Sequence, residues 1–222
     1  MAEKKRIGVL LCGCGHRDGS EVHEATCTLL AIDRAGGEAV CFAPKGPQRF
    51  VRDHLTGKEA SDTRDVLTES ARIARGQIRD VALARVSDMD ALIIPGGQGA
   101  ALNLSTFLID DLSGGVHPEV SRLTAEMVGA KKPVGAVCIA PATVGLVLRD
   151  LGIKATLTIG TDDKVASQIE QMGHRHEKCP ATSCVVDEQN RIVTTPAYMN
   201  AKSIGEVWQG VEKLVAAVME MA

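Results

Sequence analysis

One stretch decides the fold of this 222-residue chain: Lys132-Pro133-Val134-Gly135-Ala136-Val137-Cys138-Ile139-Ala140-Pro141-Ala142. The short apolar run before Cys138 is typical of a buried strand, and the small residues after it are typical of a helix start. A strand that turns sharply into a helix holds the junction side chain at the end of the sheet. The first helix amides then lie beside that side chain, where they lower a thiol pKa and stabilise an anion. The pattern therefore predicts that Cys138 is a nucleophile.

Strands and helices alternate on both sides of this stretch. We predict strands at 6–11, 38–43, 91–94, 133–137 and 155–159, and helices at 21–35, 63–75, 118–130, 140–151, 162–172 and 202–221. Residues 44–62 look irregular, and two strands at 184–187 and 191–195 have the pattern of a hairpin. The alternation predicts a flavodoxin-like α/β sandwich, with a mostly parallel sheet, helices on both faces and a nucleophile elbow. We expect residues 1–222 to form a single domain, because this length suits one such unit.

Composition excludes several classes of protein. The net charge is −3, which argues against nucleic acid or an anionic membrane as the main partner. The seven cysteines are an odd number and are scattered, unlike those of a secreted disulfide scaffold. No signal peptide is evident before the first strand, which is too short to span a bilayer. We therefore expect a reducing, cytoplasmic location.

Three segments follow or begin at strand ends and are predicted to converge. They are Asp18 to Glu24, which opens the first helix, Pro95 to Ala100, and Ala136 to Pro141. Parallel sheets bind their ligands at the carboxyl ends of the strands, where these segments lie. Ser20 or Asp18 is the expected cap of the first helix.

Each segment has a predicted chemical role. Gly96 and Gly97 let backbone amides approach a substrate oxygen, and with the Ile139 amide they would form an oxyanion pocket beside the sulfur. Glu21 and Glu24 lie three residues apart on one helix face, so either one can act as general acid and base. A carboxylate next to a thiolate is expected to share a proton with it, so the two would titrate as a pair.

The sequence resembles, over nearly its whole length, the DJ-1/PfpI superfamily of the class I glutamine amidotransferase-like fold, and seven ordered stretches carry the resemblance. Within it the sequence is most similar to the ElbB group, also called ES1 or sigma cross-reacting protein 27A. The stretches are Gly13 to Gly15, Asp18 to Ala25, His54 to Gly57, Pro95 to Ala100, Cys138 to Pro141, Thr158 to Asp162 and Val193 to Met199.

The resemblance implies a nucleophilic cysteine, which falls on Cys138, and a glutamate from the first helix. Spacing leaves Glu21 and Glu24 both open, and we favour Glu21 because it lies at the helix entrance. The resemblance also implies a glutathione-independent glyoxalase that turns glyoxal into glycolate without metal or other cofactor, a link to isoprenoid production, and a homodimer. The protein would be a lyase whose partner is a small carbonyl substrate.

One departure from the superfamily concerns histidine. Its peptidases and amidotransferases place a histidine beside the cysteine or later in the chain. Ile139 follows Cys138 here, and the stretch Gly160-Thr161-Asp162 contains no histidine. This disfavours a Cys-His hydrolase and favours a Cys-Glu mechanism.

Several alternatives stay open beside this hypothesis. Cys138 would also suit a redox-sensing or chaperone-like stress protein. Gly13, Gly15 and Gly19 loosely imitate a dinucleotide fingerprint, although the second strand ends at Ala43-Pro44 without the acidic residue that a ribose requires. The group His174, His176 and Cys179 invites a zinc interpretation, but its spacing is not that of a paired-ligand site. Cys12 and Cys14, at the rim of the expected site, are further candidates for ligand contact.

Overall fold

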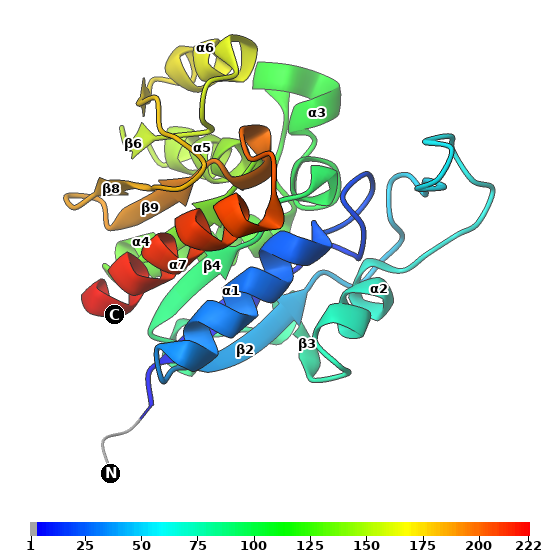
Figure 1. Ribbon diagram of the computed structural model, residues 1–222, viewed down its shortest axis with the longest axis horizontal. Helices are drawn as coiled ribbons and strands as arrows, with labels where there is room; N and C mark the ends of the chain where they lie inside the picture. Colours follow the sequence, from blue (N-terminus) through cyan, green and yellow to red (C-terminus); the bar gives the residue numbers. More distant parts are fainter. Residues whose placement is uncertain (1–3) are drawn as a thin grey trace.

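The computed structural model describes residues 4–222 and contains a seven-stranded central sheet in the order β3-β2-β1-β4-β5-β9-β8 (Figure 1). All neighbours in it are parallel except β8 and β9, which form the predicted antiparallel hairpin. Two further short strands, β6 and β7, pair with each other. The strands are β1 (Arg6–Leu10), β2 (Glu38–Ala43), β3 (Ile78–Asp80), β4 (Ala91–Ile94), β5 (Val134–Val137), β6 (Thr156–Leu157), β7 (Arg175–His176), β8 (Val185–Asp187) and β9 (Ile192–Thr195).

Helices cover both faces of this sheet. In Figure 1, α1 and α7 run side by side across one face, and α4 lies behind the sheet. The helices are α1 (Val22–Arg34), α2 (Val66–Ile73), α3 (Phe107–Asp110), α4 (Pro118–Gly129), α5 (Ala140–Asp150), α6 (Asp163–Gln171) and α7 (Ile204–Met221). Short 3-10 turns occur at Val81–Leu83, Val86–Asp88, Gln98–Ala101, Asp111–Ser113 and Ala197–Met199. The predicted fold class, an α/β sandwich with a mostly parallel sheet, is confirmed.

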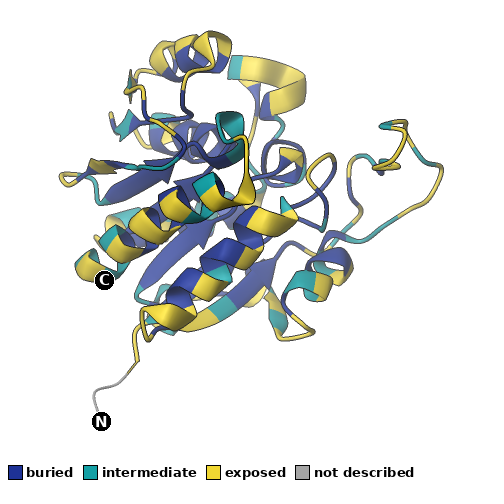
Figure 2. Cartoon of the chain, in the orientation of Figure 1, coloured by how far each residue is buried: buried dark blue, intermediate teal, exposed yellow. Residues whose placement is uncertain are grey.

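The core consists of aliphatic side chains. Every residue of β4, β5 and β9 is buried, and Figure 2 shows the sheet enclosed while the helices expose their outer sides. Central parallel strands are covered on both faces, so continuous apolar runs such as Ala91 to Ile94 are expected there. Phe42 is the one aromatic residue among the largest fully buried side chains of the described part.

The start of α1 differs from the prediction. Glu21, not Ser20 or Asp18, caps the helix, because its side chain accepts a hydrogen bond of 2.7 Å from the Glu24 amide. Ser20 Oγ accepts instead from the Cys12 amide at 2.9 Å, and Asp18 Oδ2 accepts from the Arg52 amide at 2.7 Å. The two residues predicted as caps, Ser20 and Asp18, therefore accept hydrogen bonds from amides outside the helix instead of capping it.

Sequence periodicity missed the shortest elements. The three residues of β3 and the four of α3 are too few to establish a period. Within residues 4–222, no helix is both long enough and apolar enough to cross a membrane. The prediction that no signal peptide is present was based partly on residues 1–3. These residues lie outside the part of the chain that the structure describes.

Candidate active site

Cys138 lies at a sharp junction between β5, which ends at Val137, and α5, which begins at Ala140. Its φ of 61° is in the left-handed region, which non-glycine residues seldom occupy. Its amide is held by the Thr195 carbonyl at 2.9 Å, and its side chain is nearly buried. A strained residue of this kind persists only where its surroundings hold it, and such residues cluster at functional sites.

Two backbone amides face the sulfur. The N–H groups of Gly97 and Ile139 lie beside Cys138 and lower the pKa of its thiol. Gly97 has a φ of 93°, and a Cβ there would lie 2.4 Å from the Glu21 amide nitrogen and the Gly19 carbonyl oxygen. Only glycine therefore suits this position, and the two amides form the arrangement expected of an oxyanion pocket.

Gly96 has a different role from its neighbour. A Cβ on Gly96 would lie 2.3 Å from the Cys138 Cβ and 2.5 Å from Glu24 Oε2. Its amide lies beside Glu24 and lowers the pKa of that carboxyl group. The missing side chain of Gly96 thus lets Cys138 and Glu24 approach each other. The sequence analysis had instead predicted that the Gly96 amide contacts the substrate oxygen.

Glu24 is the carboxyl group beside the thiol. Both the Cys138 Cβ and Glu24 Oε2 lie within 2.5 Å of the point where a Gly96 Cβ would stand, so less than about 5 Å separates them. Glu24 is fully buried, and its Oε1 accepts a hydrogen bond of 3.1 Å from the Tyr198 amide. Its Oε2 is buried without a well-formed hydrogen bond and faces the Cys138 thiol.

The preference for Glu21 rested on its place at the helix entrance, but in the structure Glu24, not Glu21, lies beside the thiol. Glu21 is the cap of α1, so its carboxylate turns back to the Glu24 amide. Its amide donates to the Gly96 carbonyl at 3.0 Å, which ties the helix start to the loop after β4. Its charge reaches the site only indirectly, by raising the pKa of Glu24.

Burial favours the protonated forms of both groups. Desolvation, followed by the charge of Glu21, raises the pKa of Glu24 from 4.5 to about 8. Desolvation and the charge of Glu24 raise the pKa of Cys138 well above its ordinary value, and the two amides only partly oppose this. The helix start alone predicts a low pKa for the Cys138 thiol, but burial gives this thiol a raised pKa instead. The arrangement suits a thiol that loses its proton to Glu24 as it attacks.

The glycine-rich loop after β1 packs against the loop after β4. A Cβ on Gly19 would lie 2.3 Å from the Cys14 amide nitrogen, and one on Gly99 would lie 2.5 Å from the Gly19 Cα. These glycines therefore serve contact between two backbones, which disfavours the dinucleotide-binding alternative. Cys12 is fully buried beside Ser20, and burial raises the pKa of Cys12 to about 12.

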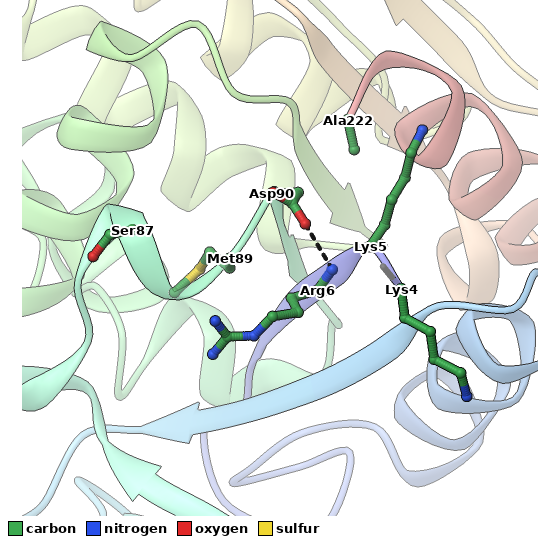
Figure 3. A pocket seen from close by; sticks show the side chains of 7 residues that line it. All are labelled: Lys4, Lys5, Arg6, Ser87, Met89, Asp90 and Ala222. Carbon is green, nitrogen blue, oxygen red and sulfur yellow. Dashed lines mark hydrogen bonds between the residues drawn. The ribbon is translucent and has the colours of Figure 1, made fainter. Parts of the chain in front are cut away.

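The other candidate positions lie apart from Cys138. His174 is buried and its Nε2 hydrogen-bonds to the Gly145 carbonyl at 2.8 Å, which accounts for its burial without a ligand. Residues 4–222 contain no group of three or more His, Cys, Asp or Glu side chains placed to hold a metal ion. A pocket of about 350 Å³ lies at the start of β1. Figure 3 shows the residues that line it, Lys4, Lys5, Arg6, Ser87, Met89, Asp90 and Ala222. This is the opposite end of the sheet from Cys138.

Sequence reasoning missed the segment that follows β9. Thr195 holds the Cys138 amide, and Tyr198 holds Glu24 through its own amide. The Tyr198 hydroxyl also lies 2.8 Å from His23 Nδ1 on α1. These contacts join residues far apart in the chain, so residue spacing assigned this segment no role, although Val193 to Met199 is one of the stretches that carry the family resemblance.

Curated proteins similar to this chain are named as ES1 proteins or as a glutamine amidotransferase-like protein. The mitochondrial ES1 protein homolog of Rattus norvegicus is 38% identical over 98% of this chain and 84% of its own length. The mitochondrial glutamine amidotransferase-like class 1 domain-containing protein 3 of Homo sapiens is 39% identical over 97% and 83%.

The chain belongs to the ES1 family of class I glutamine amidotransferase-like proteins. No family model matches it. Among solved structures, an isoprenoid biosynthesis protein with an amidotransferase-like domain from Ehrlichia chaffeensis has a TM-score of 0.91 and 40% identity, covering 98% of this chain and 100% of that one. Drosophila melanogaster DJ-1beta, at 18% identity and a TM-score of 0.55, covers 99% and 96% and shares the fold.

The expectation of a cytoplasmic location is wrong by this comparison. The relatives from rat, human and Danio rerio are all named as mitochondrial proteins. The expectation rested on free cysteines, and the structure has all seven unpaired. Free thiols indicate a reducing environment, but they do not say which reducing compartment holds the protein.

Proposed function

We propose that this ES1-family chain is a glutathione-independent glyoxalase-like enzyme that converts small 2-oxoaldehydes, such as glyoxal, into 2-hydroxy acids. Cys138 is its nucleophile and Glu24 its general base and acid. The observation that carries the proposal is the buried Glu24 carboxyl against the Cys138 thiol, with the Gly97 and Ile139 amides at the same sulfur.

The first step is addition of the thiol to one aldehyde carbon. A sulfur–carbon bond forms as the C=O π bond breaks, and Glu24 takes the thiol proton. The negative charge that develops on the aldehyde oxygen is stabilised by the Gly97 and Ile139 amides. Glu24 then returns the proton to that oxygen, which leaves a hemithioacetal. A carboxyl group with a pKa of about 8 is suited to this exchange near neutral pH.

The second step is an internal redox reaction. Glu24 removes the proton from the carbon that bears sulfur and oxygen, and returns it to the neighbouring carbon through an enediol, while the hydroxyl proton of the first carbon passes to the oxygen of the second. The first carbon is thereby oxidised to a thioester and the second is reduced to an alcohol, so no external oxidant or reductant is needed. Water then cleaves the thioester, which releases glycolate and restores the Cys138 thiol.

The raised pKa of Cys138 weighs against the redox-sensing alternative. Oxidation by peroxide proceeds through the thiolate, and susceptible cysteines combine a low pKa with exposure. Cys138 is only 8% exposed, and burial raises the pKa of its thiol.

The proposal does not extend to isoprenoid synthesis, with which the Ehrlichia relative is associated by its description. The groups that most strongly shift the pKa values of Cys138 and Glu24 are acidic or neutral. A prenyl diphosphate would call for cationic partners.

The test is turnover of glyoxal to glycolate by purified protein without glutathione, followed by NMR. Cys138→Ser and Glu24→Gln are each expected to lower kcat/KM about 100-fold or more, as for loss of a nucleophile or a general base. Wild-type turnover in both variants would refute the proposal.

Two matched variants serve as controls. Glu21→Gln keeps a side-chain oxygen that can cap α1, and Cys41→Ala removes a buried thiol from β2. Both are expected to stay within a few-fold of wild type, because neither group contacts the reacting atoms. A loss in Glu21→Gln equal to that in Glu24→Gln would return the catalytic role to Glu21.

A further inference from the structure

The end of β9 and the segment that follows it contact both residues of the proposed reactive pair, Cys138 through its backbone amide and Glu24 through its carboxyl group. The Thr195 carbonyl accepts the Cys138 amide at 2.9 Å, and the Tyr198 amide donates to Glu24 Oε1 at 3.1 Å. These two contact residues are three positions apart. The conformation of residues 195–200, which we call the β9 turn, therefore sets where the thiol and the carboxyl lie relative to each other.

The β9 turn has a conformation that it would not favour by itself. Ala197 has a φ of 42°, in the region that usually requires glycine. Two short backbone bonds close the turn, from the Met199 amide to Pro196 at 2.9 Å and from the Asn200 amide to Ala197 at 3.0 Å. Such strained backbone persists only when surrounding contacts hold it in place.

Asn200 provides those contacts through both ends of its carboxamide. Its Oδ1 accepts hydrogen bonds from the Thr161 amide at 3.2 Å and from the Thr161 hydroxyl at 3.1 Å. Its Nδ2 donates to the Cys179 carbonyl at 3.2 Å. One side chain thus ties the β9 turn to the loop after β6 and to the loop before β8.

Gly160 leaves the space that Asn200 fills. It has a φ of 92°, and a Cβ on it would lie only 2.4 Å from Asn200 Oδ1. The Tyr198 hydroxyl, which lies 2.8 Å from His23 Nδ1, provides a second anchor on α1. The turn is therefore held from two directions, and Asn200 is the anchor with the larger number of hydrogen bonds.

We propose that Asn200 is a positioning residue for the Cys138–Glu24 pair, because it holds the β9 turn so that Thr195 engages the thiol residue while Tyr198 engages the carboxyl. The inference rests on the pair assigned in the proposed function, and it adds a residue that touches neither reacting atom. The ionisable groups that interact with Glu24 come from every element packed against it: Glu21 and Cys27 from α1 and its start, Cys138 from the β5–α5 junction, Cys12 from the loop after β1, and Tyr198 from the β9 turn.

The test measures alkylation of Cys138 by iodoacetamide between pH 6 and 9, resolved by peptide mass spectrometry. In this reaction a sulfur–carbon bond forms, the carbon–iodine bond breaks with loss of iodide, and the thiol proton passes to the base. Without Asn200 the Tyr198 amide no longer stays on Glu24 Oε1, and that hydrogen bond lowers the pKa of Glu24. Asn200→Ala should therefore slow alkylation about threefold to tenfold at pH 7 and move the pH inflection upward.

Asn190→Ala is the matched control. Asn190 lies in the hairpin at the opposite end of β9, and its Nδ2 donates to the Lys154 carbonyl at 3.0 Å and to Asp187 Oδ2 at 2.8 Å. Its loss should leave the pH profile of Cys138 unchanged. An equal shift in Asn190→Ala would mean general loosening and would overturn the inference.

A milder variant keeps the test decisive if Asn200→Ala does not fold. Thr161→Val removes one of the hydrogen bonds to Asn200 Oδ1 and should move the inflection in the same direction by a smaller amount. The inference fails if Glu24→Gln changes the pH profile of Cys138 while Asn200→Ala and Thr161→Val do not. A profile unchanged by Glu24→Gln would instead refute the Cys138–Glu24 pair of the proposed function.

Discussion

Glu24 and Cys138 face each other in surroundings that favour the proton on each. Glu21 and Glu24 lie on one face of α1, so their spacing alone did not distinguish them. The distinction comes from Glu21 capping the helix, while Glu24 enters the interior and meets the thiol. Two chemically identical carboxyl groups thereby take different roles because their surroundings differ.

The first prediction is a pH dependence of glyoxal turnover. The base form of Glu24 must accept the thiol proton, and burial raises the pKa of Glu24 to about 8. Below that pH, kcat/KM should rise about tenfold per pH unit, and it should level off above it. The inflection belongs to the Cys138–Glu24 pair, since the two groups titrate together.

Initial rates measured between pH 5.5 and 9 in one buffer series would check this prediction. Glu21→Gln should keep the rising limb, because the titrating carboxyl remains. It should also move the inflection to lower pH, since the negative charge of Glu21 raises the pKa of Glu24. A rate that is flat from pH 5.5 to 8 in the wild type would contradict the assignment of Glu24 as the base.

At the scale of elements, the site depends on how closely three loops approach. The loops after β1, β4 and β5 were predicted to converge because parallel strands end at one edge of the sheet. The loops can approach so closely because glycines stand where a Cβ would collide with the neighbouring loop or side chain, among them Gly96, Gly97 and Gly99.

The second prediction concerns Gly97→Ala. The new Cβ would meet the Glu21 amide nitrogen and the Gly19 carbonyl oxygen at 2.4 Å, and the φ of 93° is unfavourable for alanine. Backbone atoms cannot move aside cheaply, so we expect a loss of about 3 kcal/mol or more in the free energy of unfolding. Urea denaturation would measure the loss.

Gly36→Ala is the matched control for this variant. Gly36 has a φ of 77° and nothing within 4 Å of its Cβ position, so only the backbone penalty of about 1 kcal/mol should appear. Equal losses in the two variants would show that close loop contact adds nothing at Gly97.

For the whole molecule, the buried carboxyl affects the pH dependence of folding. The pKa of Glu24 rises from 4.5 to about 8 on folding, so the folded state holds the proton more tightly than the unfolded state. Between these two values the unfolded chain loses the proton and the folded chain keeps it. This contribution to stability is therefore fully present below pH 4.5 and is lost as the pH rises towards 8.

The third prediction follows from this loss of stability with rising pH. The free energy of unfolding of Glu24→Gln minus that of wild type should increase from pH 5 to pH 8, by at most about 1.4 kcal/mol per pH unit. Chemical denaturation at several pH values would measure the difference, in which the other titrating groups cancel. A difference that stays constant over this range would rule out the raised pKa.

The single domain at 1–222 and the homodimer stay predictions, because neither the fold nor the family membership tests them. A single cooperative unfolding transition would support the first, and sedimentation equilibrium would decide the second.

The sequence by itself determined the strand–cysteine–helix junction at Cys138, the parallel α/β sheet and the convergence of the glycine loops. These features depend on apolar periodicity and on turns within a few residues, which local sequence specifies. The tertiary structure alone decided that Glu24 and not Glu21 meets the thiol, that burial raises both pKa values, and that the β9 turn holds the pair. These depend on desolvation and on contacts such as that of Tyr198 with Glu24, 174 positions apart, which exist only once the chain has folded.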